Sequence, residues 1–170
     1  MTIPLTAGAA WLAKVAGYKR PSGSHHPWPL GGGPAPIPIG AAFNVVRVPA
    51  ASAASALRRL ESLDTPTGPV LAEEHAWSFF VPLWLTDGRD IPGGLLLTGA
   101  DGRQTLSCPR PGQPATRSRY WKTVPDGSGQ LLEPAALAGA LAYAYVTATP
   151  QWTGTEDEPP DTAERQAGAL

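Results

Sequence analysis

Residues 40–82 constrain the fold of this chain more than any other part of the sequence. Residues 43–48 form an almost continuous apolar and β-branched run, which is typical of a strand buried on both faces. Residues 50–63 place apolar side chains on one helical face and charged side chains on another, which indicates a helix that crosses over a sheet. Residues 70–73 and 77–81 follow as two strands around a tight turn. This order of strand, helix, strand and strand predicts a helix-covered sheet of the α+β or α/β class.

Length and composition fit one globular domain that is rich in loops. The chain has 170 residues, of which 42% are hydrophobic, and this is enough for one hydrophobic core. Its 20 prolines and 19 glycines indicate many irregular connections. We therefore expect a single domain over residues 1–152 with a proline- and glycine-rich loop at 21–40. Residues 153–170 are acidic and lack apolar periodicity, so we expect a disordered tail there.

Charge and cysteine content exclude several classes of protein. The net charge is −1, but residues 153–170 hold five acids against one arginine, so the body carries 12 basic and 9 acidic residues. That excess is much smaller than in a typical DNA-binding domain. Cys108 is the only cysteine, which excludes an internal disulfide and a cysteine-cluster zinc site. The start of the chain does not resemble a signal peptide and no apolar run could span a bilayer, so we expect a cytoplasmic protein without membrane contact.

The remaining segments predict two helices, a hairpin and a last strand. A short helix should follow Thr6 and end near Gly17, and a longer one should begin at Pro134. The buried face of the longer helix should consist of Leu137, Leu141, Ala144 and Tyr145. Residues 95–98 and 104–108 flank an Asp-Gly turn and predict a β-hairpin, and residues 117–124 predict a strand. Residues 21–40 are too broken for regular structure and form either an arm anchored by Trp28 or a mobile loop.

Four motifs in order resemble one known family. They read PIGAAFNVVRVP, ALRRLESLDTPTGPV, HAWSFFVP, and GGLLLTGADGRQTLSCP followed by SRYWK. In this order they resemble the primase-polymerase (Prim-Pol) domain of the archaeo-eukaryotic primase superfamily, above all its short, divergent actinobacterial members. The resemblance covers about residues 11–145. It implies a single Prim-Pol or RRM-like α+β domain, in which a mixed or antiparallel sheet is packed by two or three helices.

The resemblance also implies that the catalytic acids are missing. Active members hold two divalent ions about 4 Å apart with carboxylates. At the paired-acid positions this chain has Arg47 and Pro49, and the third acid falls near Leu96. The family's phosphate-facing histidine falls at or near Trp77, with His75 two residues away. We therefore expect no metal, no cofactor and no nucleotidyl transfer.

One basic and aromatic group could bind nucleic acid. Its members are Arg103, Arg110, Arg117, Arg119, Tyr120, Trp121 and Lys122, and Arg47 could add to it. Arginine and lysine pair with phosphates, and aromatic rings stack on bases. On a strand, Arg117, Arg119 and Trp121 would share one face, with Tyr120 and Lys122 on the other. The alternative is an edge strand protected by charge, with one aromatic ring in the core.

Three other groups contain reactive residue types, and we interpret all three as structural. They are Glu73-Glu74-His75, His25-His26 and Cys108. In a strand, neighbours in the first group would point to opposite faces and could not share one site without a bulge. We therefore interpret this group as the ordinary polar residues of a solvent-facing turn. The histidine pair has no obvious third or fourth metal ligand and should lie in a surface loop. The cysteine should be a half-buried residue at a strand end.

These observations leave three functions open. The leading hypothesis is a catalytically inactive Prim-Pol-like module that binds single-stranded nucleic acid or a nucleotide and acts in regulation. The second is a protein-interaction module whose anchors are the loop residues Trp28, Trp84 and Trp152. The third is an active DNA primase or polymerase, which the missing acids disfavour.

Overall fold

The computed structural model describes residues 5–17, 27–29, 32–100, 103–114 and 118–148. Several residues singled out in the sequence lie outside these ranges, namely His25, His26, Arg117, Trp152 and the segment 153–170.

The described residues form an α+β fold with three helices and two antiparallel sheets, as predicted. The helices are α1 (Ala7–Val15), α2 (Ala50–Ser62) and α3 (Pro134–Ala148). The strands are β1 (Ala35–Pro38), β2 (Asn44–Pro49), β3 (Val70–Glu73), β4 (Ala76–Val81), β5 (Leu95–Leu97), β6 (Thr105–Cys108) and β7 (Arg119–Thr123). Within the described residues, none of the helices has the length and apolar character needed to cross a membrane.

The larger sheet contains five strands in the order β5-β2-β4-β3-β7. All neighbouring pairs are antiparallel, so β2 and β3, which α2 connects, run parallel to each other on either side of β4. The predicted order of strand, helix, strand and strand is therefore confirmed. Pro49 ends β2 and stands directly before the first residue of α2, because proline fits a strand end and a helix start better than the middle of either.

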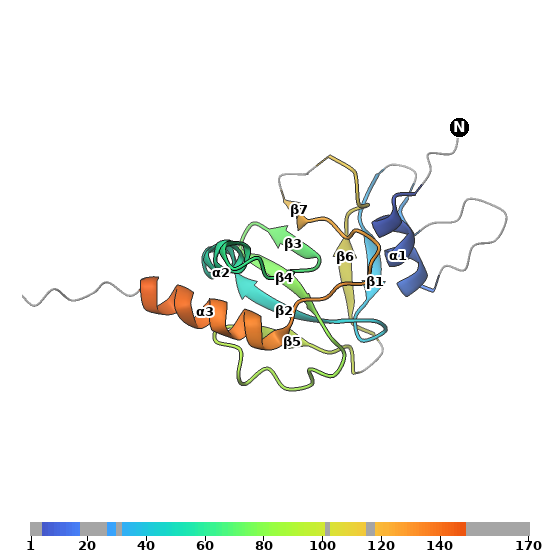
Figure 1. Ribbon diagram of the computed structural model, residues 1–170. Coiled ribbons are helices and arrows are strands. Elements are labelled where there is room, and N and C mark those ends of the chain that lie inside the picture. The colour runs from blue at the N-terminus through green and yellow to red at the C-terminus, as the bar shows by residue number, and fades with distance from the viewer. Residues whose placement is uncertain (1–4, 18–26, 30–31, 101–102, 115–117, 149–170) are drawn as a thin grey trace, which may run out of the picture.

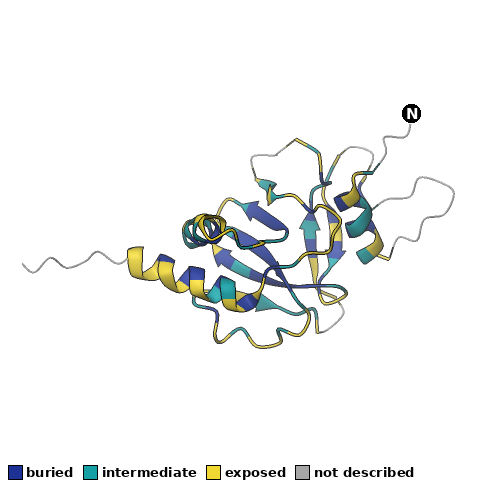
Figure 2. Cartoon of the chain, in the orientation of Figure 1, coloured by how far each residue is buried: buried dark blue, intermediate teal, exposed yellow. Residues whose placement is uncertain are grey.

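The five-stranded sheet lies between two different layers (Figure 1). Helices α2 and α3 cover one face, which we call the helix-side face, and the β1–β6 ribbon with α1 lies against the other, the ribbon-side face. Alternation along β4 serves both cores, since Phe79 packs toward the helices and Phe80 toward the ribbon. Figure 2 shows the sheet as mostly buried, whereas the outer side of α3 is exposed.

The predicted hairpin between residues 95–98 and 104–108 is wrong. Strand β5 pairs with β2 at the edge of the large sheet, and β6 pairs with β1 in the ribbon. The chain changes sheets at Gly99, which has a φ of 61° and lies so close to Ile39 that a Cβ would be 1.9 Å from its carbonyl oxygen. Only glycine fits this conformation and this approach, so its role is to cross between sheets.

The proline-rich segment is more regular than predicted. Residues 35–38 form β1, in which the buried Ala35 and Ile37 alternate with Pro36 and Pro38. Proline lacks an N–H group and is therefore confined to edge strands, and β1 has a partner on one side only. The predicted anchor is confirmed, because Trp28 is 2% exposed and its Nε1 donates a hydrogen bond to the Cys108 carbonyl oxygen at 2.9 Å.

Helices α1 and α3 follow the prediction with one difference. Thr6 caps α1, since its Oγ1 accepts a hydrogen bond from the Ala9 amide at 3.2 Å. Helix α3 buries Leu137, Leu141 and Ala144, as predicted, but Tyr145 is 40% exposed. The buried stripe is turned toward Ala140 instead.

Candidate nucleic-acid interface

The ribbon-side face of the sheet is covered over only part of its area. Val45, Leu71 and Phe80 point to this face and are buried against the ribbon and α1. Two positions further along their strands, Arg47 and Glu73 point the same way, and Arg119 meets Glu73 from β7. A row of charged side chains therefore begins where the cover of the ribbon ends.

These three residues form what we call the arginine–glutamate cluster. Arg47 Nη2 lies 2.8 Å from Glu73 Oε2, and Arg119 Nε donates a hydrogen bond to Glu73 Oε1 at 2.9 Å. Arg119 Nη2 also contacts Glu73 Oε1. The side chain of Glu73 is 12% exposed, whereas those of Arg47 and Arg119 are 40% and 30% exposed. The cluster thus combines one nearly buried carboxylate with two accessible cations and has a formal charge of +1.

The contact between Arg47 and Glu73 passes over strand β4. Ser78 lies opposite Arg47 in the pairing of β2 with β4, and its side chain points to the same face. Ser78 is fully buried, and its Oγ has no hydrogen-bond partner among the described residues. Glu73 Oε2 is buried as well, and its ion pair with Arg47 lacks the geometry of a hydrogen bond. Two buried oxygens with unused hydrogen-bonding capacity therefore belong to this face, which is uncommon in folded proteins.

The prediction that Glu73 is a solvent-facing turn residue is wrong. Glu74 and His75 do form an exposed turn, with side chains 77% and 89% exposed. Glu73, however, is the last residue of β3 and shares the face of Leu71, so it points toward Arg47 and Arg119. The alternation along residues 70–73 carried part of this signal, because it places Glu73 on the same face as Leu71.

Strand β7, which carries most of the predicted basic and aromatic group, divides its side chains between the two faces of the sheet. This agrees with the prediction for Arg119, Tyr120, Trp121 and Lys122. Trp121 packs on the ribbon side together with Arg119, whereas Tyr120 packs on the helix side. Lys122 Nζ lies 5.2 Å from the ring centre of Trp77 and 5.4 Å from that of Tyr120, which places it near two aromatic rings at the sheet edge. Tyr120 and Lys122 are therefore separated from the arginine–glutamate cluster by the sheet.

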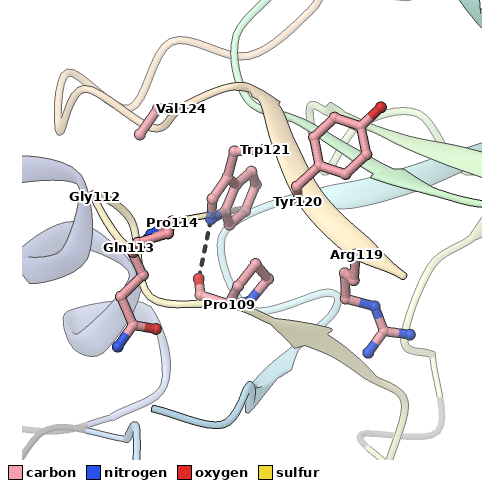
Figure 3. A pocket seen from close by; sticks show the side chains of 8 residues that line it. All are labelled: Pro109, Gly112, Gln113, Pro114, Arg119, Tyr120, Trp121 and Val124. Carbon is pink, nitrogen blue, oxygen red and sulfur yellow. Dashed lines mark hydrogen bonds between the residues drawn. The ribbon is translucent and has the colours of Figure 1, made fainter. Parts of the chain in front are cut away.

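Trp121 is partly a core residue. Its ring packs edge-on against Phe80 at a centroid distance of 5.8 Å, and its Nε1 donates a hydrogen bond to the Pro109 carbonyl oxygen at 3.0 Å (Figure 3). A pocket of about 330 Å³ opens beside it, and its lining includes Pro109, Gln113, Pro114, Arg119 and Trp121. A second pocket, of about 440 Å³, shares four of its residues, Pro109, Gln113, Pro114 and Arg119. The indole N–H is thus engaged, and only the ring surface is left to contact a ligand.

The other two arginines lie at opposite ends of β6. Arg110 follows Pro109 and therefore lies near the Trp121 end of the ribbon. Arg103 precedes β6 beside Gln104, whose carbonyl oxygen accepts a hydrogen bond from the Ile39 amide. The length of β6 separates the two residues, so the structure brings Arg110, and not Arg103, toward the cluster.

The positions that the predicted resemblance assigns to the family's acids carry no carboxylate. Pro49 shares the face of Arg47, two residues away. Leu96 pairs with Val46 and packs against the helix-side core, so the residue beside Arg47 is Leu95. Among the described residues, no group of three or more His, Cys, Asp or Glu side chains could hold a metal ion.

Cys108 is fully buried and not half-buried as predicted. It ends β6 opposite Ala35, under the loop that carries Trp28. Burial raises the pKa of its thiol far above the ordinary range, which disfavours the reactive thiolate. The interpretation of Cys108 as a structural residue therefore agrees with its surroundings.

Comparisons of the chain with protein-family models, with curated proteins and with solved structures gave no match. The resemblance to the Prim-Pol family therefore stays a prediction, and a functional proposal has to rest on the geometry of the ribbon-side face.

Proposed function

We propose that this domain is a catalytically inactive Prim-Pol-like module that binds single-stranded nucleic acid on the ribbon-side face and serves in regulation. The observation that carries the proposal is the position of Arg47 and Arg119, two partly exposed guanidinium groups on one face of the sheet. Guanidinium groups match phosphate oxygens in charge and in geometry, so they suit a phosphodiester backbone.

The surroundings of the two arginines support this ligand. The aromatic ring of Trp121 and the apolar prolines of the adjoining pockets lie beside Arg119. Aromatic rings next to cations hold single strands without reading their sequence. Arg47 and Pro49 at the paired-acid positions cannot ligate a divalent ion, which supports binding without catalysis.

The test is the binding of a fluorescent oligothymidylate of about 20 nucleotides, followed by fluorescence anisotropy from about 50 to 300 mM NaCl. Binding should weaken as salt rises and should be the same with Mg²⁺, with Mn²⁺ and with a chelator. In a plot of the logarithm of the binding constant against the logarithm of the salt concentration, Arg47→Ala combined with Arg119→Ala should make the slope shallower. The change should be about 0.7 for each phosphate that the variant no longer neutralises. Arg58→Ala combined with Arg89→Ala removes the same charge from exposed sites elsewhere and is the matched control.

Three results would contradict the proposal. Metal-dependent primer extension by the pure protein would indicate an active polymerase, and equal effects of the two double variants would remove the cluster from the binding site. Absence of any binding at low salt would favour the second candidate, a protein-interaction module.

The observation behind that candidate is Trp84, which is 63% exposed next to the exposed Leu83. Trp28 no longer supports it, because Trp28 is buried in the core.

A further inference from the structure

The arginine–glutamate cluster already holds an anion at the place where the proposed function needs one. The Glu73 carboxylate contacts both Arg47 and Arg119, and each arginine comes from a different strand. A ligand phosphate that engages both guanidinium groups would therefore have to compete with Glu73. This competition decides how tightly, and to which anions, the face can bind.

We propose that Glu73 is a built-in competitor for a phosphate-binding site, and that a bound phosphate group displaces its carboxylate and bridges Arg47 and Arg119. The ligand class is a phosphate group with at least two free oxygens, from a nucleic-acid backbone or from the end of a small molecule. The assignment to a nucleic-acid backbone rests on the proposed function; the phosphate site itself does not.

Charge and geometry favour this exchange. Carboxylates and phosphates accept hydrogen bonds from guanidinium groups in the same forked arrangement, so one can replace the other. The two arginines carry two positive charges and Glu73 one negative charge. A phosphate diester has the same single negative charge as Glu73, whereas a doubly charged terminal phosphate is attracted more strongly by the two arginines. Weak monovalent anions such as chloride offer only one contact and should not displace the carboxylate.

Two buried oxygens of the site also favour the exchange. Glu73 Oε2 and Ser78 Oγ are both buried without a hydrogen-bond partner among the described residues. The Oε2 atom of Glu73 is thus held by its ion pair with Arg47 and not by a hydrogen bond. Ser78 is the residue opposite Arg47 on β4, and its hydroxyl is a donor on the same face. A phosphate between the arginines could accept that hydrogen bond, whereas Glu73 does not.

The position of Glu73 in its strand allows the side chain to leave. It is the last residue of β3 and is followed by the exposed Glu74–His75 turn. A rotation of its side chain toward the turn would move the carboxylate into water without breaking the pairing of β3 with β4, which ends at Ala72.

The experiment uses Glu73→Gln, which removes the competing charge but keeps the size of the side chain. The control is Glu74→Gln, which makes the same change in net charge at an exposed neighbour. Each full-length protein is titrated with pyrophosphate while its melting temperature is measured, and with the fluorescent oligothymidylate described above. Glu73→Gln should bind both probes about tenfold more tightly than the parent, because a charge-assisted hydrogen bond contributes about that factor. Glu74→Gln should match the parent.

Each outcome decides the proposal. Unchanged or weaker binding of pyrophosphate by Glu73→Gln would overturn it and leave Glu73 as a residue that only positions the arginines. Tighter binding of pyrophosphate without any binding of oligothymidylate would uphold it and refute the proposed function, with a terminal phosphate as the ligand. If Glu73→Gln does not fold, Glu73→Asp tests the same point, because it withdraws the charge by one methylene group and should give a smaller gain of the same sign.

Discussion

The two faces of the five-stranded sheet are built differently. On the helix-side face, α2 and α3 cover a mostly apolar set of sheet residues, and the buried Asn44 of β2 is the polar exception among the described residues. On the ribbon-side face, the small β1–β6 ribbon and α1 cover the rows around Val45, Leu71 and Phe80, and charged side chains, two of them partly exposed, follow at the next positions. Those positions carry Arg47, Glu73 and Arg119.

Under the proposed function, this difference would let one sheet separate stability from binding. A face closed by two long helices has no place for a ligand, and its residues serve the core. A face covered by a short ribbon leaves strand ends open, and charged residues there can meet both the solvent and a ligand. The contrast predicts that substitutions at neighbouring residues of a single strand change the free energy of unfolding by very different amounts.

The largest effect should come from the helix-side core. Phe79→Ala removes a fully buried ring that packs with the helices, and such truncations cost about 3–5 kcal/mol. The melting temperature, measured by circular dichroism, should fall by roughly 10 °C or more. A loss below about 1.5 kcal/mol would mean that the helix-side face is not the closed core described above.

A smaller effect should come from the arginine–glutamate cluster. Arg119→Ala leaves the nearly buried Glu73 carboxylate with Arg47 as its remaining cation in the cluster, and the cost should be about 1 kcal/mol after allowance for solvent screening. Arg89→Ala is the matched control, since it removes an ion pair with Asp87 that is largely exposed. Urea denaturation should show a clear shift for the first variant and almost none for the second. Equal shifts would show that the cluster is an ordinary surface ion pair.

The smallest effect should come from Ser78, the neighbour of Phe79 on β4. Ser78 is fully buried like Phe79, but its hydroxyl has no hydrogen-bond partner among the described residues. Ser78→Ala should therefore leave the free energy of unfolding within about 0.5 kcal/mol of the parent or raise it. A loss above about 1 kcal/mol would reveal a hydrogen bond to Ser78 in solution and would remove the hydroxyl from the proposed phosphate site.

Local sequence signals predicted the elements whose pattern is self-contained. The capping Thr6, the apolar stripe of α2 and the run that forms β2 each lie within one short segment, and the structure contains all three. The alternation of side chains in β7 was predicted in the same way, so Arg119 and Trp121 were correctly placed on one face. Arg47 was expected to join them, because the resemblance to the Prim-Pol family implies a substrate groove over the face to which the acids of the first strand point, and Arg47 stands at one of those positions.

Glu73 was missed because its environment comes from three strands. Its segment alone reads as a strand followed by a polar turn, and two of the three polar residues there are indeed exposed. Only the order of the strands brings Arg47 across β4 and Arg119 across the β3–β7 pair to the same carboxylate. Local exposure patterns therefore could not distinguish Glu73 from Glu74.

The sequence by itself determined the fold class, the positions of the helices and most strands, and the faces to which the described residues of β7 point. These follow from backbone propensity and from the periods of side-chain direction, which act over a few residues. The tertiary structure alone decided that β5 and β6 belong to different sheets, that the prolines of β1 form a ribbon edge, and that Glu73 lies between two arginines. These depend on which strand edges meet, and strand pairing joins residues far apart in the chain whose sequences carry little record of their partner.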